Sequence, residues 1–282
     1  MPFWLFGLLF LSLSCADILA QTPSKLEMTQ KLLHAIDNVS TLRYRFKKYE
    51  RHKDKLLYEE MDVRLARNPF RVYLYQYTPN KGAEVLYTAK ESPNKALVNP
   101  GKFPYINLSL DPYGSILLEG QHHPLMHTGF DRFAEIIRVA LKKYQKNLDE
   151  VFTIEGSLVW NQIDCYKVVL TPINFSWIDY TVKPGEDLWK IEKELGLSAH
   201  MILEKNPTIK HQRDIKAGQV IKIPTDYAKR TVLYVDKRTY LPIVQFIYDD
   251  KGLFEQYEHH NLELNPKMLP DEFTKECKSY HF

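Results

Sequence analysis

The sequence predicts an α+β fold in which a long antiparallel sheet is covered by a few helices. Three observations support this prediction. Aromatic residues make up 13% of the chain but only 11 of its 282 residues are glycine, a balance that suits pleated, half-buried surfaces. Runs with period-two alternation are separated by short turn signals, which is typical of an antiparallel meander. Two segments with helical spacing interrupt these runs, which indicates helices packed on a sheet.

The composition is that of an ordinary globular protein. Hydrophobic residues make up 44% of the chain and charged residues 26%, which excludes a disordered chain, a collagen-like fibre and a multi-span membrane protein. Lys and Arg number 38 against 35 Asp and Glu, a net charge of +3. This balance lacks the basic excess that nucleic-acid binding requires, so we expect no nucleic-acid partner.

The first 20 residues read as an export signal. The segment from Phe3 to Leu13 is almost entirely apolar, too short to span a bilayer but long enough for a signal-peptide core. We expect cleavage after Ala20. An alternative starts from Leu13-Ser14-Cys15, which resembles a loose lipobox and would give a lipid anchor at Cys15. Both routes predict an exported mature chain.

The order of elements in the main body follows from caps and periodicity. Ser24 to Glu27 is a capping box that begins a helix ending near Asn38. Thr128 to Asp131 is a second capping signature, and we expect an amphipathic helix from there to about Gln145, with Arg132 on its polar side. Strands are predicted at Leu42–Lys48, Leu56–Ala66, Phe70–Tyr77, Ala83–Thr88, Val151–Leu170 (turning near Asn161), Thr231–Asp236, Ile243–Tyr248 and Phe254–Leu262.

Residues 178–225 break the strand pattern. A short strand at Tyr180–Lys183 is followed by a helix that Asp187 can cap and Gly196 can end. Ser198 caps a second helix, which stops at Asn206-Pro207. A turn and a second strand complete a β-α-α-β unit of its own.

This unit resembles a LysM domain. The resemblance rests on three motifs in order: Tyr180-Thr-Val-Lys-Pro-Gly-Glu-Asp-Leu-Trp-Lys-Ile191, Asn206-Pro207, and Ile215-Lys-Ala-Gly-Gln-Val-Ile-Lys-Ile-Pro224. It implies binding of an N-acetylglucosamine glycan, peptidoglycan or chitin, in a shallow groove between two loops, with apolar contacts from Leu188 and Ile209. Asp187 stands where the family often has Ser or Thr. The groove residues implied are Pro184, Gly185, Glu186, Asp187, Leu188, Asn206, Pro207, Thr208 and Ile209.

The flanks of this unit indicate an insertion into a hairpin. Its two terminal strands pair, so its ends lie close together, and a module with adjacent ends can replace a hairpin loop. We therefore expect Tyr166–Leu170 and Thr231–Val235 to be neighbouring strands of one sheet. The host domain would be residues 25–176 and 227–282, around a LysM domain at 178–225. Cys165 and Cys277 both fall in the host, where a disulfide between them and two separate buried thiols remain alternatives.

The host resembles the LolA/LolB-like lipoprotein-carrier fold found in exported bacterial families. The segments that carry this resemblance are Val235–Pro242, Tyr248–Gly252, Leu262–Pro266 and Leu269–Phe273; Gln121–Phe130 looks like the signature of one uncharacterised family of this kind. The resemblance implies a curved half-barrel sheet, a non-catalytic fold that can shelter an acyl chain, a lipid or lipoprotein partner, and a place in the periplasm or at the outer membrane.

His122, His123 and His127 form the one cluster that suggests acid–base or metal chemistry. We expect a loop whose imidazoles bond backbone groups, without metal, cofactor or catalytic residue, because no nearby Glu or Cys completes a ligand set and Pro124 prevents a helical His-x-x-x-His face. Cys165 lies inside a strand pattern, which is poor exposure for a nucleophile. Two alternatives remain: an envelope enzyme that uses this cluster, and a scaffold that binds no small molecule.

Overall fold

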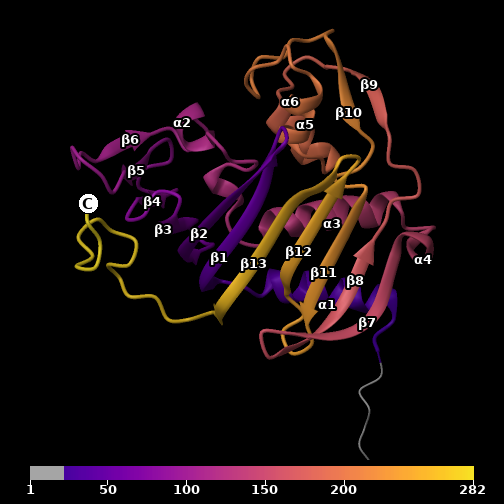
Figure 1. Cartoon of the computed structure of the whole chain (residues 1–282), viewed down its shortest axis with the longest axis horizontal. Helices are drawn as coiled ribbons and strands as arrows, with labels where there is room; N and C mark the ends of the chain where they lie inside the picture. The colour runs from indigo at the N-terminus through magenta and orange to yellow at the C-terminus, as the bar shows by residue number, and fades with distance from the viewer. Residues whose placement is uncertain (1–21) are drawn as a thin grey trace, which may run out of the picture.

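The computed structural model describes residues 22–282, and its main body is one open, curved antiparallel sheet (Figure 1). The strand order is β6-β5-β4-β3-β2-β1-β13-β12-β11-β8-β7, with β6 and β7 at the edges. The strands are β1 (Thr41–His52), β2 (Lys55–Ala66), β3 (Arg71–Thr78), β4 (Glu84–Thr88), β5 (Ala96–Asn99), β6 (Leu108–Leu110), β7 (Phe152–Trp160), β8 (Ile163–Leu170), β11 (Arg230–Asp236), β12 (Pro242–Asp249) and β13 (Gly252–Leu264).

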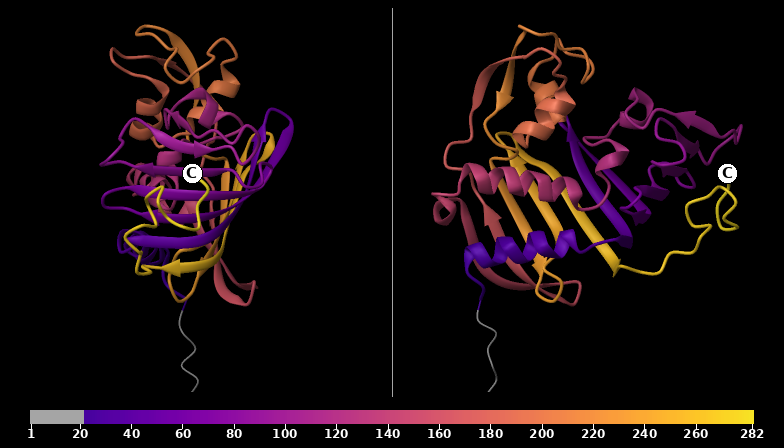
Figure 2. Two further views of the ribbon diagram at one scale, coloured as in Figure 1. Left: turned by 90° about the vertical axis from the view of Figure 1, so that its left-hand side faces the viewer. Right: turned by 180° about the vertical axis from the view of Figure 1, so that it is seen from behind.

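Two long helices cover the same face of this sheet. The helices α1 (Lys25–Asp37) and α3 (Asp131–Lys143) both cross in front of the strands when the molecule is seen from behind (Figure 2). Met28 and Leu32 of α1 and Ala134 of α3 are buried against the strands in the main apolar core. Three short helical segments connect these elements: α2 (Ser115–Leu118), η1 (Leu125–His127) and α4 (Leu148–Val151). The predicted α+β class, with a curved sheet and covering helices, is confirmed.

The inward face of β1 changes character along its length. Leu42 and Tyr44 lie in the apolar core, but Lys48 and Glu50, further along the same face, are charged and equally buried. Period-two alternation places all four side chains on one side of the strand. The covered face is therefore apolar near α1 and polar at its other end.

The polar end of the sheet carries the β-α-α-β unit. It consists of β9 (Trp177–Thr181), α5 (Leu188–Leu195), α6 (Ala199–Lys205) and β10 (Val220–Pro224), and Figure 1 shows it above the β1–β2 and β12–β13 hairpins. β9 and β10 pair antiparallel, and the unit has a separate apolar core. β8 and β11, on either side of the unit in sequence, pair directly with Leu170 opposite Thr231. This pairing is the one expected for an insertion into a hairpin.

The last residues of the chain pack on the opposite face of the sheet. Tyr280 stacks on Tyr73 of β3 with ring centroids 3.6 Å apart, and Cys277 joins the same cluster. Cys165 of β8 is buried in the main core cluster. Both cysteines are free thiols, because Cys277 packs near β3 and β4 and several strands of the sheet separate these from β8. Of the two alternatives for this pair, the structure has the separate thiols.

Two local predictions about α3 are wrong. Thr128 does not cap this helix, because its hydroxyl donates to the carbonyl of Leu125 in η1; Phe130 holds the N-cap position without a side-chain bond. Arg132 is not on a solvated face but only 5% exposed, because the inserted unit covers it.

The expected signal peptide and the lipidation alternative at Cys15 lie outside residues 22–282. Within that range, the structure has no helix with both the length and the apolar character needed to cross a bilayer.

Candidate binding cavity and glycan-binding turns

A cavity of about 630 Å³ lies between the concave face of the sheet and α3. Most of its wall is apolar, and residues from β1 to β6, from the segment 116–129, from α3 and from β11 to β13 contribute to it. Leu195 and Gly196 of the inserted unit also line it, so both parts of the chain form its wall. Its apolar lining includes Phe46, Met61, Val63, Leu74, Val85, Leu117, Phe133, Ile136 and Ile137.

One end of the cavity is polar and its charges are paired. Lys48 Nζ donates to Glu50 Oε2 at 3.1 Å and also bonds Gln121. Gln121 Nε2 donates to Glu59 at 2.6 Å, and the Tyr257 hydroxyl donates to Glu50 Oε1 at 2.8 Å. Burial alone would raise the pKa of Glu50, but the Lys48 ammonium and the neighbouring imidazoles outweigh it and hold that pKa well below its usual value.

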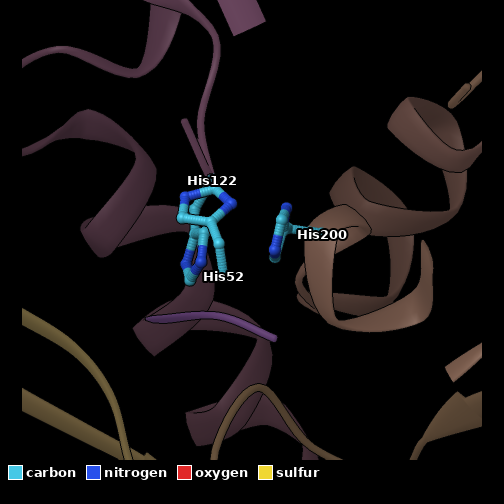
Figure 3. A group of neighbouring side chains, drawn as sticks. All are labelled: His52, His122 and His200. Carbon is cyan, nitrogen blue, oxygen red and sulfur yellow. The ribbon is translucent and has the colours of Figure 1, made fainter. Parts of the chain in front are cut away.

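Three imidazoles meet where the inserted unit contacts the sheet: His52 at the end of β1, His122 before η1, and His200 on α6 (Figure 3). Both ring nitrogens of His122 already have hydrogen-bond partners. Its Nδ1 lies 2.8 Å from Glu255 Oε1 and its Nε2 lies 2.9 Å from the Arg51 carbonyl oxygen. The His200 ring stacks on it with centroids 4.0 Å apart. The group is therefore a packed, hydrogen-bonded contact between the two parts of the chain.

A second group of possible ligands begins with His123, the residue after His122, and also contains His127 and Glu192. The Nδ1 atoms of the two histidines are 3.5 Å apart, and His127 Nδ1 is 3.5 Å from Glu192 Oε1. Both histidines line the cavity, and Glu192 comes from α5 of the inserted unit. Glu192 is 1% exposed.

The pKa values in this region follow from burial and neighbouring charge. Burial would raise the pKa of Glu255, but the imidazoles of His123 and His122 outweigh it and lower that pKa to about 2. Burial would lower the pKa of His123, but Glu255 outweighs it and raises that pKa. Burial, with His123 and Arg132 nearby, lowers the pKa of His127 to about 2, which keeps this imidazole neutral.

Arg132 fixes the inserted unit to α3. Its Nη2 donates to the Glu192 carbonyl at 3.0 Å and to the Leu197 carbonyl at 2.8 Å. Gly196 lies between these two positions in the left-handed conformation, with φ of 64°, and a Cβ there would meet Val139 Cβ of α3 at 2.9 Å. The close approach of α5 to α3 therefore requires glycine at this position.

The expectation for the histidine cluster is wrong in one respect. Carboxylates do lie beside it, since Glu255 and Glu192 contact His122, His123 and His127. Pro124 does prevent a helical His-x-x-x-His face, because it precedes only the short η1. The turn of η1 nevertheless brings the rings of His123 and His127 to 5.6 Å between centroids. Sequence reasoning missed Glu192, Glu255 and Arg132, whose residue types gave no local signal of these contacts.

The nine residues expected to bind glycan form two turns of the LysM-like unit, one at the start of α5 and one after α6, and most of their side chains have structural roles. Leu188 is fully buried and Ile209 is 5% exposed in the same core, so these side chains pack inward. Asp187 accepts the Lys190 N–H at the start of α5. Glu186 accepts from the Tyr180 hydroxyl, and Asn206 bonds the backbone of Ile202 and Lys222. The exposed members are Pro184, Gly185, Pro207 and Thr208.

Several solved structures align with this chain over most of its length at low identity. The lipoprotein LppX of Mycobacterium tuberculosis is 12% identical, with 88% of this chain and 99% of that one covered and a TM-score of 0.42. A DUF1329 family protein from Desulfovibrio piger is 13% identical, with 90% and 98% covered and a TM-score of 0.37. A LolA superfamily protein from Nitrosomonas europaea is 10% identical, with 90% and 99% covered and a TM-score of 0.30.

No curated protein matches the chain significantly. Two family models match parts of it. Residues 39–163 match a family described as a protein of unknown function, DUF1571, and residues 180–224 match the LysM domain. The LysM domain predicted from the three motifs is thereby confirmed, and this chain carries it next to a DUF1571 region.

Proposed function

We propose that this protein is an exported cell-envelope protein that binds peptidoglycan, or another N-acetylglucosamine glycan, through its LysM domain and holds an acyl chain of a lipid or lipoprotein in its host cavity. The cavity of about 630 Å³ carries this proposal. A scaffold without a ligand has no need of such a space, because protein cores normally fill to crystal-like density. A largely apolar pocket with a few polar groups at one end suits an amphiphile.

Each proposed domain binds one ligand. The host domain, residues 25–176 and 227–282, holds the acyl chain, and the LysM domain, residues 178–225, binds the glycan. The two exposed turns would contact the glycan mainly through backbone groups, since the side chains of Glu186, Asp187 and Asn206 are already bonded within the domain. A single LysM copy binds weakly, and the repeated glycan of a polymeric wall offsets this. We therefore place the protein at the cell envelope, where a bacterium has both peptidoglycan and lipid.

Mass spectrometry of lipids that co-purify with the chain tests the carrier role. Ala140 lines the cavity from α3, so Ala140→Trp should fill it and reduce the bound lipid strongly. Arg138→Trp, at an exposed position on the same helix, is the matched control and should keep the lipid. Wild-type protein purified free of lipid, and unable to take up a fluorescent fatty acid, would contradict the proposal.

Sedimentation with insoluble peptidoglycan tests the LysM role. Thr208→Tyr places a bulky side chain on an exposed groove turn and should weaken binding by about tenfold or more, equal to about 1.4 kcal/mol. Lys193→Tyr changes an exposed position on α5, away from both turns, and should bind as wild type does. Equal retention of both variants would place the glycan elsewhere on the molecule.

A further inference from the structure

We propose that His123, His127 and Glu192 bind a zinc ion, which links the host domain to the LysM domain. This inference goes beyond the proposed function and does not depend on it. It starts from the distances between three ligand atoms. His123 Nδ1 and His127 Nδ1 are 3.5 Å apart, and His127 Nδ1 is 3.5 Å from Glu192 Oε1. One ligand atom from each residue lies within 4.8 Å of the other two.

These separations are close to those that zinc imposes. With zinc–nitrogen bonds of about 2.0–2.1 Å, two ligand atoms of a tetrahedral site lie roughly 3.3 Å apart. Two of the three separations exceed this value by about 0.2 Å, and the third, between His123 and Glu192, is at most 4.8 Å. Small side-chain rotations that shorten this third separation would seat an ion. Two imidazoles with one carboxylate are also the ligand set of many zinc sites that keep a fourth position open.

The atoms of His123 and Glu192 that would not bind the ion face other polar groups, and such contacts orient metal-binding side chains. His123 turns its other nitrogen, Nε2, toward Glu255 Oε1 at 3.3 Å and the Tyr227 hydroxyl at 3.1 Å. A carboxylate behind a histidine fixes its tautomer and leaves Nδ1 for the metal. Glu192 Oε2 accepts the Ala199 N–H at 2.9 Å, which leaves Oε1 for the ion. Arg132 Nε is 3.3 Å from Oε1 but makes no hydrogen bond.

The surrounding charges favour a dication. The buried groups connected to this site include more carboxylates than permanent cations. The carboxylates are those of Glu50, Glu59, Glu192 and Glu255, and the cations are Lys48 and Arg132. A zinc ion at this site would place two positive charges at one point beside the Glu192 and Glu255 carboxylates.

The neighbouring group of His52, His122 and His200 does not compete for this role. Both ring nitrogens of His122 already face acceptors, the Glu255 carboxylate and the Arg51 carbonyl. Its ring is also stacked on that of His200, with an angle of 21° between their planes, so their in-plane lone pairs cannot converge on one ion. Figure 3 shows the His200 ring next to the His122 ring. These histidines therefore provide a matched control at the same junction.

The proposed ion joins two parts of the chain. Glu192 belongs to α5 of the LysM domain, whereas both histidines belong to the host and line its cavity. Three protein ligands leave a fourth coordination position, which a water or an oxygen atom of a cavity ligand can take. Zinc should therefore stabilise the docked LysM domain as well as bind to the protein.

Zinc titration of the full chain, purified without a histidine tag and dialysed against a chelator, tests this site. Calorimetry should show one zinc per chain with a Kd in the micromolar range or below. His127→Ala and Glu192→Gln should each weaken binding by more than about a hundredfold, beyond the roughly tenfold to hundredfold loss of an outer-shell partner. His200→Ala should bind zinc as wild type does. Circular dichroism of each variant checks that it is folded.

Cobalt substitution keeps the test decisive if a ligand variant fails to fold. Co²⁺ bound to the wild-type chain should show the intense visible bands of four-coordinate cobalt and should be displaced by zinc. Failure of the wild type to bind zinc, or the weak spectrum of six-coordinate cobalt, would overturn the proposal. Zinc binding that His200→Ala removes and His127→Ala leaves intact would also overturn it, by moving the ion to the other group.

Discussion

The core of the LysM domain and its junction with the host sheet are built in different ways. The core consists of aliphatic side chains such as Leu188, Ile191 and Ile202, all from a segment of about 45 residues. The junction combines one apolar contact, Met201 against a host cluster that includes Phe254, with buried charged and imidazole side chains. Among these, the Arg132–Glu192 contact joins residues 60 positions apart in the chain. Apolar packing thus folds the LysM domain, whereas its position on the host also depends on buried polar contacts.

The difference matters because polar contacts are directional and respond to charge. An apolar interface tolerates small rotations, but Arg132 donates to two backbone carbonyls of the LysM domain and lies beside the carboxylates of Glu192 and Glu135 at the same time. Breaking one member of such a buried set leaves the others without partners, which costs more than the set contributes while intact. The junction should therefore respond strongly to single substitutions that leave both cores unchanged.

The largest effect is expected from Arg132→Ala. This change leaves Glu192 buried without its cation and two carbonyls without a donor, so it should lower the free energy of unfolding by about 3–5 kcal/mol. Chemical denaturation at pH 7 measures the change. Arg138→Ala is the control on the same helix, because its pair with Asp37 is about half exposed and should be worth less than about 1 kcal/mol. Similar losses in both variants would show that Arg132 does not hold the junction.

A second test concerns the loss of stability in acid that His259, at the apolar end of the covered face, should cause. Burial of His259 against Tyr44 and Phe130 lowers its pKa to about 3. Between pH 6.5 and 3 the unfolded chain therefore takes up a proton that the folded chain does not, and stability falls as the pH falls.

Because of His259 alone, the free energy of unfolding should fall by about 1.4 kcal/mol for each pH unit within this range. His259→Phe keeps an aromatic ring in the same place and should remove that part of the slope, measured by urea denaturation at pH 7, 5.5 and 4.5. The exposed His211→Phe should leave the slope as it is. An unchanged slope in His259→Phe would mean that other buried imidazoles with lowered pKa values, such as those of His127 and His200, determine the response between pH 7 and 4.5.

A third test separates backbone strain from contact at the junction. Gly196 and Gly218 both lie in the LysM domain with positive φ, but only at Gly196 would a Cβ meet another residue within 4 Å, namely Val139 of α3. Both alanine variants carry the left-handed penalty. Gly196→Ala should therefore cost about 1–2 kcal/mol more than Gly218→Ala, through forced overpacking. Thermal melting curves of the two variants give this difference, and equal costs would show that α5 and α3 separate easily.

The same contrast explains which features the sequence could predict. The LysM helices follow from local signals: Asp187 and Ser198 cap them and Gly196 ends the first, within a few residues of each helix. The pairing of Leu170 with Thr231 followed from the need to keep the ends of an insertion together. These predictions required no knowledge of distant contacts.

The candidate site could not be predicted because its parts carry no local signal. Arg132 has the spacing of a solvated residue on an amphipathic helix, and Glu192 looks like any charge on the outside of a short helix. Each becomes buried only when the two domains meet. Lys48 and Glu50 continue a strand whose inward face is otherwise apolar, and the sequence does not reveal that Gln121 and Tyr257 will pair with them.

The smallest effect concerns a residue to which the sequence assigned glycan contact and the structure gives a capping role. The Asp187 carboxylate accepts the Lys190 N–H at 2.8 Å, so Asp187→Ala should cost about 1 kcal/mol of stability, as for other N-caps. Asp187→Ser keeps a capping oxygen and should stay within a few tenths of a kcal/mol of wild type. If the cap is the main role of this side chain, both variants that remain folded should sediment with peptidoglycan as wild type does. A folded Asp187→Ala that no longer sediments would instead place the carboxylate on the sugar, and the backbone of the two turns would not be sufficient for binding.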